Sequence, residues 1–130
     1  MQRAKDKAGS KPRDICERTF SFAVEIVTLC RSLEQADSAA CALARQLIRS
    51  GTSIGANVEE AQGGQSRADF ISKYAIARKE ARETHYWLRL LAATGIVTDN
   101  AVSTLIQECN ELIAILTAII KNTQANRSSQ

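Results

Sequence analysis

The sequence is poor in the residues that interrupt helices. Its 130 residues include one proline, Pro12, and six glycines. Because proline breaks a helix interior, the absence of proline after position 12 leaves long uninterrupted helices possible. The residues that dominate the middle of the chain are good helix formers: Ala, Leu, Ile, Glu, Arg and Gln.

Long apolar runs are also missing. The longest, such as residues 113–116, span only a few positions, whereas a helix needs ~18 apolar residues to cross a bilayer. Residues 1–13 are basic and polar and lack the apolar stretch of a secretory signal. We therefore expect a cytoplasmic protein that makes no membrane contact.

Metal ligands are few and badly spaced. The four cysteines form no CxxC pair, and three of them fall at apolar helical positions, which favours free buried thiols in a reducing cytosol over a zinc site. The one histidine, His85, has Arg82 three residues before it, where a di-iron bundle needs Glu. We predict no metal, no cofactor and no catalytic residue. The cysteines are Cys16, Cys30, Cys41 and Cys109.

Charge is unevenly distributed along the chain, whose net charge is +3. Residues 1–13 hold five basic residues and one acidic residue (+4), and residues 121–130 hold two basic residues (+2), which leaves the body at −3. The excess positive charge therefore belongs to the tails. Four tail residues are candidate nucleic-acid contacts: Lys5, Lys7, Lys11 and Arg13.

Apolar periodicity predicts four amphipathic helices, over about residues 14–33, 39–62, 66–94 and 98–122. Because the links between them are short, neighbouring helices should be antiparallel. We predict an all-α, antiparallel up-down four-helix bundle over residues 14–122. Residues 1–13 and 123–130 are predicted to be disordered tails.

The first and fourth helices each carry two apolar stripes. The first helix has Phe22, Ile26, Leu29 and Leu33 on one stripe and Phe20, Ala23, Val27 and Cys30 on the other. The fourth has Val102, Leu105, Cys109, Leu112, Leu116 and Ile119 beside Ile106, Ile113 and Ile120. A second stripe offers apolar area to another copy of the chain, so we predict a homo-oligomer. The alternative is a wide face that packs only on the core.

The centre of the second helix, residues 50–55, reads SGTSIG. Small residues there would let a neighbouring helix approach closely. A hairpin that turns near Gly64 would place Glu80 against Ser50, so that hydroxyls satisfy a partly buried carboxylate. The predicted structural polar network is Ser50, Ser53, Asn57, Glu80 and Glu83. The alternative is a polar ligand pocket inside the bundle.

The third helix carries a row of basic residues. Arg78, Arg82, His85 and Arg89 follow a 4-3-4 spacing, with Lys79 at the edge, and we name these five residues the cationic ridge. A ridge without acids on the same line could hold phosphates. The alternative is a solvated face, or pairing between subunits with acids of the fourth helix, Glu108 and Glu111. No groove-reading motif or aromatic platform for bases is evident.

Part of the chain resembles a known family. Residues 53–60 read SIGANVEE, Gly63 and Ser66 follow, residues 69–71 read DFI, and residues 75–88 read AIARKEARETHYWL. These motifs, within a match over about residues 17–120, resemble the bacterial four-helix bundle proteins, also called 23S ribosomal RNA intervening-sequence proteins. The chain departs from the family pattern at Gly55, where Pro is frequent, and after the turn, where Arg67 stands in for an earlier basic residue.

The resemblance implies an up-down bundle that assembles as a ring-like homopentamer. It also implies association with RNA, because some members are encoded within insertions in ribosomal RNA genes. We therefore expect a non-enzymatic, RNA-associated homo-oligomeric scaffold.

Two alternatives stay open. One is a protein–protein interaction module without nucleic acid. The remote one is a helical ribonuclease, because Arg78 and His85 are spaced like the Arg and His of a family of such enzymes. There His85 would act as general base and Arg78 would stabilise the transition state.

Overall fold

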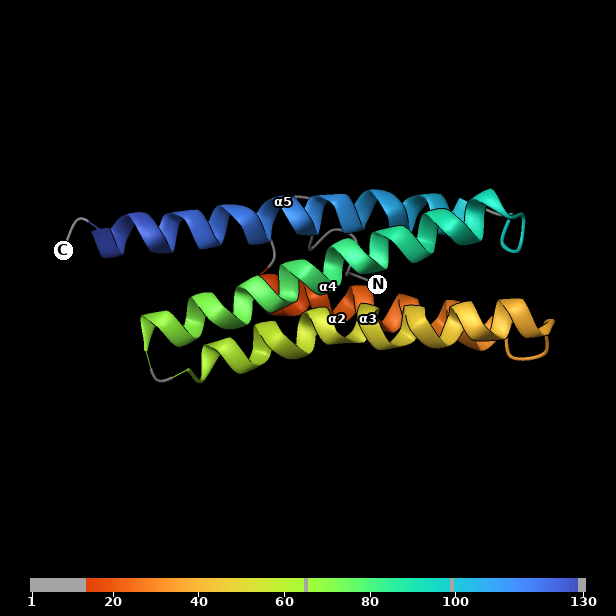
Figure 1. Cartoon of the computed structure of the whole chain (residues 1–130), viewed down its shortest axis with the longest axis horizontal. Helices are drawn as coiled ribbons and strands as arrows, with labels where there is room; N and C mark the ends of the chain where they lie inside the picture. Colours follow the sequence, from red (N-terminus) through yellow and green to blue (C-terminus); the bar gives the residue numbers. More distant parts are fainter. Residues whose placement is uncertain (1–13, 65, 99, 129–130) are drawn as a thin grey trace, which may run out of the picture.

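Four helices make up the fold of the computed structural model, which describes residues 14–64, 66–98 and 100–128. They are α2 (Ile15–Ser32), α3 (Ser38–Gln62), α4 (Arg67–Ala93) and α5 (Asn100–Ser128). Consecutive helices run in opposite directions, and no strand lies in the described ranges (Figure 1). The prediction of an all-α, antiparallel four-helix bundle is confirmed.

Two of the helices, α3 and α4, begin at a residue whose side chain caps them. The Asp37 carboxylate accepts a hydrogen bond from the Ala40 amide at 2.9 Å, and Ser66 Oγ accepts one from the Asp69 amide at 3.0 Å. These caps satisfy amides that have no partner within the helix. Asp14 also stands at an N-cap position, but its side chain makes no capping bond.

The last helix is longer than expected. It was predicted to end near residue 122 but continues to Ser128, so the predicted C-terminal tail is wrong for residues 123–128. Residues 122–128 contain no glycine or proline to stop a helix. This end of α5 also lies beside the α3–α4 turn, where Thr123 and Phe70 line one hollow. The predicted tail residues 1–13 and 129–130 lie outside the described residues.

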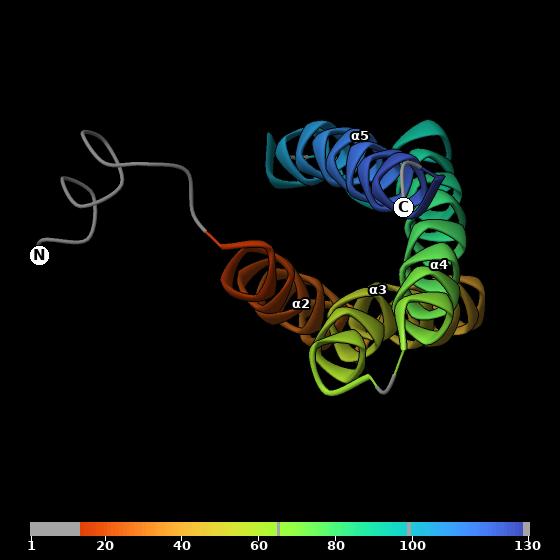
Figure 2. The same cartoon turned by 90° about the vertical axis from the view of Figure 1, so that its left-hand side faces the viewer.

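The bundle is open along one side. α3 packs between α2 and α4, and α4 packs between α3 and α5, whereas α2 and α5 touch only sparsely. Figure 2 shows the four helices as a curved row with α2 and α5 at its ends. The apolar surface of these two helices is therefore less covered than that of α3 and α4.

The predicted apolar stripes form most of the core. Phe22, Ile26, Leu29 and Leu33 of α2 are all buried. One correction falls near the end of α5, where Ile120 is buried and Ile119 is only partly covered. A straight helix has 3.6 residues per turn, so a stripe drawn at intervals of 3.5 drifts away from the core with length.

The small residues of α3 lie where α2 approaches. A Cβ atom added to Gly51 would lie 2.9 Å from Ile26 Cγ2, and one added to Gly55 would lie 3.2 Å from Thr19 Oγ1. No larger residue fits at Gly51 without moving Ile26. The expected close approach at this segment is confirmed, and its partner is α2.

α5 is long and apolar enough to cross a membrane by length and composition. Its most apolar stretch has a mean hydropathy of 1.3, and 28% of that stretch is buried. A core helix of a soluble protein passes the same test, and α5 contributes Leu105, Leu112 and Leu116 to the core. The absence of membrane contact stays a prediction.

Replacing Gly51 with alanine should destabilise the fold. Forcing a methyl group against Ile26 costs about 1–3 kcal/mol, which exceeds the gain of about 1 kcal/mol from better helix propensity. We expect a net loss of about 1 kcal/mol or more in the free energy of unfolding, measured by urea denaturation. Gly63→Ala is the control, because its added Cβ would meet nothing closer than 3.9 Å. Equal losses for the two variants would contradict the close-packing explanation.

Candidate nucleic-acid interface

The cationic ridge lies along one side of α4. Arg78 Nη1 donates to Thr117 Oγ1 of α5 at 3.5 Å, which places this side of α4 next to α5. Arg82, Arg89 and Lys79 are exposed, while Arg78 and His85 are half-buried. From Arg78 to Arg89 the ridge covers about 16 Å of helix. The structure thus brings the five predicted residues together on one surface.

The basic side chains of the ridge have no acidic partner within the described part of the chain. The ion pairs found there involve Arg18, Arg49 and Lys73 as the cations. Arg78, Lys79, Arg82 and Arg89 take part in none of them. Their charges are available to an anionic ligand.

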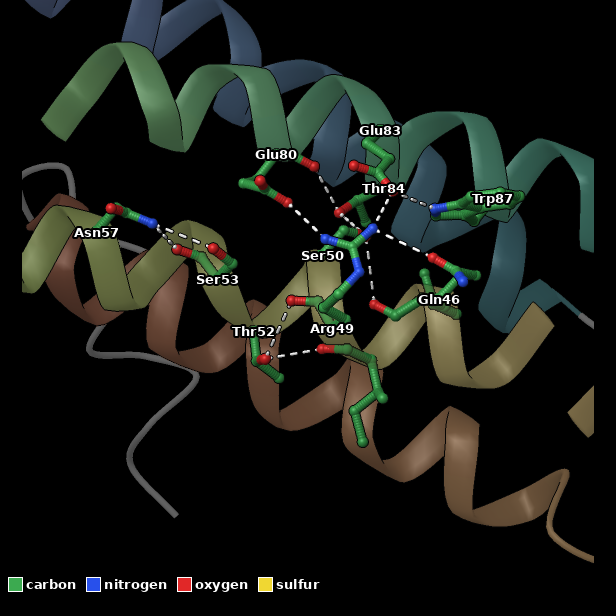
Figure 3. A network of polar contacts seen from close by, with 12 residues as sticks. Gln46, Arg49, Ser50, Thr52, Ser53, Asn57, Glu80, Glu83, Thr84 and Trp87 are labelled. Carbon is green, nitrogen blue, oxygen red and sulfur yellow. Dashed lines mark hydrogen bonds and ion pairs between the residues drawn. The ribbon is translucent and has the colours of Figure 1, made fainter. Parts of the chain in front are cut away.

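The acids that flank the ridge are held by cations of other helices. On the α3 side, Arg49 forms ion pairs with both Glu80, at 3.3 Å, and Glu83 (Figure 3). On the α5 side, Arg18 of α2 binds Glu108 through two hydrogen bonds of 2.8 and 2.9 Å and also contacts Glu111. The hydrogen bonds that Arg18 donates to the Glu108 carboxylate raise the pKa of Arg18.

The ion pairs of Arg18 make one alternative for the ridge less favourable. In that alternative the ridge would pair with Glu108 and Glu111 of a neighbouring subunit. Since Arg18 already binds both within the chain, they are less available to another copy.

The polar network differs from the one expected. Glu80 was expected to meet the hydroxyls of Ser50 and Ser53, but Arg49 meets it instead, because a guanidinium is a stronger partner for a carboxylate than a hydroxyl. Ser50 Oγ lies 2.8 Å from Thr84 Oγ1, one helical turn beyond Glu80.

The five predicted network residues therefore fall into separate groups (Figure 3). Ser53 Oγ accepts from Asn57 Nδ2 at 3.1 Å, within α3. Glu80 and Glu83 share Arg49, and Trp87 Nε1 also donates to Glu83 at 3.0 Å. Ser50 belongs to the buried hydroxyl pair with Thr84. Arg49 and Thr84 were not found from the sequence, because the register between α3 and α4 decides which side chains meet.

His85 contributes no charge to the ridge near neutral pH. Its Nε2 atom is buried and has no hydrogen-bond partner among the described residues. Burial and the nearby positive charge of Arg89 both lower the pKa of His85 below its usual 6.5. The charge of the ridge therefore comes from its three arginines and Lys79.

Tyr86 is an exposed aromatic residue of α4 that was not among the predicted site residues. It stands between Arg82 and Arg89 on the outer surface of α4, and 50% of its area is exposed. The Arg89 guanidinium carbon lies 5.8 Å from the centre of its ring. The sequence shows the 4-3 spacing of Arg82, Tyr86 and Arg89. The apolar pattern alone does not show that no neighbouring helix covers the Tyr86 ring.

Cys30 and Cys109 behave as core residues rather than as reactive groups, whereas Cys16 and Cys41 are only partly buried. Burial raises the pKa of Cys30 to about 11 and that of Cys109 to about 12. Their Sγ atoms donate to backbone carbonyls, of Ala44 at 3.4 Å and of Ala81 at 3.2 Å. No group of three or more His, Cys, Asp or Glu within the described ranges could hold a metal ion.

The predicted tail contacts cannot be placed with the ridge. Lys5, Lys7, Lys11 and Arg13 lie outside the described residues.

The fold and the ridge together define a class: an up-down four-helix protein with a row of cations on its third helix. The chain belongs to the family of 23S rRNA-intervening sequence proteins, whose model matches residues 11–118. It is also similar to a solved structure of a protein of unknown function from the S23 ribosomal protein family of Bacteroides thetaiotaomicron. That protein is 44% identical, the match covers 83% of this chain and 99% of the other, and the TM-score is 0.77. The curated proteins contain no match.

The lowered pKa of the half-buried His85 predicts a pH dependence of stability. Because the pKa of His85 is lowered in the folded chain, the unfolded chain binds the proton first as the pH falls through about 6.5, and stability decreases. His85→Gln should therefore lose less thermal stability than the unmodified protein between about pH 7.5 and pH 5.5. Melting curves followed by circular dichroism measure both losses. Equal losses would show that His85 is as easily protonated in the folded chain as in the unfolded one.

Proposed function

We propose that this protein is a non-enzymatic homo-oligomeric scaffold that binds RNA through its phosphates. The observation that carries the proposal is the separation of charge on α4. Four cations of the cationic ridge lack an acidic partner in the described chain, while the acids beside them are bound by Arg18 and Arg49. Membership in the family of 23S rRNA-intervening sequence proteins supports RNA as the polyanion.

The ridge is better suited to contacting the phosphate backbone of RNA than to recognising a base sequence. Long, exposed cationic side chains such as Arg82 and Arg89 reach phosphates, which carry no sequence information. Each neutralised phosphate releases a counterion, so the logarithm of the binding constant falls with the logarithm of the salt concentration, with a slope near −0.7 per contact on single strands. Four cations would thus give a slope of roughly −3 per subunit.

Apolar surface on α2 supports self-association. Phe20 is 65% exposed and Val24 is 49% exposed, on the helix that lies at the open side of the bundle. Phe20 also borders an apolar hollow between α2 and α3 that is lined by Ala23, Gly55 and Ala56. Together with the sparse cover of α5, these residues offer an interface for another copy. The family resemblance suggests five copies.

The same apolar surface supports the second candidate, a protein-interaction module without nucleic acid. The ribonuclease alternative receives less support. A general base needs a nitrogen within hydrogen-bond reach of the substrate, and Nε2 of His85 is buried. Arg78 is directed toward Thr117 of α5.

Self-association should appear as a mass several times the 14.2 kDa of one chain. We expect light scattering coupled to size exclusion to give such a multiple, about fivefold by the family resemblance. Placing two charges in the interface, as in Phe20→Glu with Val24→Glu, should lower the mass, because burying unpaired charges is costly. Ile76→Glu, on exposed α4 surface, is the control and should keep the assembly. A mass near one chain across micromolar concentrations would rule the scaffold out.

Charge reversal on the ridge should weaken RNA binding. In filter binding with structured ribosomal RNA fragments at about 50 mM salt, Arg82→Glu with Arg89→Glu should reduce the salt slope by about 1.4, the share of two contacts. The matched control reverses Arg31 and Arg45, which line a hollow between α2 and α3. It changes net charge equally but leaves the ridge intact.

Three results would count against RNA binding by the ridge. The proposal fails if the full chain binds no RNA at about 50 mM salt and tens of micromolar protein. The ridge is not the site if both double variants weaken binding equally. Deleting residues 1–13 tests the contribution of the basic tail to RNA binding. If this deletion abolishes binding and the ridge variant does not, the RNA contact resides in the tail.

A further inference from the structure

We infer that Tyr86 is a stacking platform for an unpaired base, so that the RNA held by the cationic ridge is single-stranded at this point. This inference rests on the proposed RNA binding and specifies its ligand. Its basis is the position of an exposed aromatic ring among cations that have no acidic partner in the described chain.

The ring and the cations share one surface line. Lys79, Arg82, Tyr86 and Arg89 follow a 3-4-3 spacing, which keeps them on the same face of α4. All four are exposed. They cover about 15 Å of helix, the length of a short run of nucleotides. A strand laid along this line would meet cations on both sides of the ring.

The ring is held in place before any ligand binds. The Arg89 guanidinium lies 5.8 Å from the ring centre, and the Trp87 ring meets Tyr86 edge to face, with centres 5.2 Å apart and planes at 71°. Trp87 is itself fixed, because its Nε1 donates to Glu83 at 3.0 Å and Glu83 is paired with Arg49 (Figure 3). A ring ordered in this way loses little further conformational entropy when a base stacks on it.

The electrostatics around the ring favour an anionic strand. Glu83, one turn before Tyr86, is the acid nearest to it along α4, and its carboxylate is bound to Arg49 and Trp87 on the α3 side. Phosphates beside the ring would therefore meet Lys79, Arg82 and Arg89 rather than a free carboxylate. Cationic side chains with an interposed aromatic ring are the combination that binds single strands.

A paired RNA helix fits this surface less well. Bases in a duplex are stacked on one another, and aromatic side chains stack on bases that loops, bulges and ends leave free. A duplex could use the cations of the ridge but would leave Tyr86 without a partner. The exposed ring therefore distinguishes the two kinds of RNA.

The test compares strands that differ in their bases and variants that differ at Tyr86. The full chain is titrated with a strand of about twelve adenylates, with an abasic strand of equal charge, and with a duplex. Tyr86→Leu keeps apolar bulk but removes the aromatic face, and it should weaken binding of the adenylate strand by about fivefold or more. Tyr86→Phe keeps the face and should stay within about twofold of the unmodified protein.

Two further readouts separate stacking from a general effect on the protein. Tyr86→Leu should leave binding of the abasic strand and the duplex unchanged, because these contacts are electrostatic. Trp87 is the only tryptophan of the chain, so its fluorescence should change when the adenylate strand binds and should stay constant with the abasic strand. Melting curves confirm that both variants fold.

The outcomes distinguish this inference from the proposed function. If the strands bind but Tyr86→Leu has no effect on the adenylate strand, stacking is wrong and phosphate binding by the ridge stands. If Tyr86→Leu weakens all three ligands equally, Tyr86 acts on the structure of the site and stacking is wrong. If no RNA binds, the proposed function fails and the inference fails with it.

Discussion

Close packing on two sides of α3 is the constraint on which the rest of the structure depends. Gly51 receives Ile26 of α2, and the preceding residue, Ser50, pairs with Thr84 of α4 inside the bundle. Neighbouring residues of a helix point about 100° apart, so two small residues in sequence let α2 and α4 approach from adjacent directions. The position of α4, and therefore of its exposed surface, follows from the small size of Ser50, while Gly51 sets how closely α2 approaches.

Once α4 lies at this distance, Arg49 can reach across to Glu80 and Glu83. Arg49 is half exposed, and ion pairs of this kind add little to stability. Their larger effect is on the distribution of charge. The acids of the middle of α4 are drawn toward α3, while Arg82, Arg89 and Lys79 face outward without acidic partners in the described chain.

Much of the fold could be predicted because helix periodicity and capping are local properties. The apolar stripe of α2 follows directly from residue spacing, and the side chains that cap α3 and α4, Asp37 and Ser66, bond amides only three residues away. The partners of Glu80 were not, because they depend on the register of two helices across a glycine-rich turn. The ridge was predictable as a row of residues on one helix, whereas the exposure of Tyr86 depends on how neighbouring helices leave α4 uncovered. The continuation of α5 past residue 122 was missed because no local signal ends the helix there.

The two proposed activities occupy different parts of the molecule. The apolar residues Phe20 and Val24 lie on α2, at one end of the row of helices, while the ridge lies on α4, within the row (Figure 2). An assembly formed through the ends of the row would therefore leave the ridge of each subunit exposed. Four cations and one ring give a weak single site, but repeated sites on one assembly raise the effective concentration of the ligand at each of them. In this arrangement the fold supplies the contact, and the assembly would supply most of the affinity.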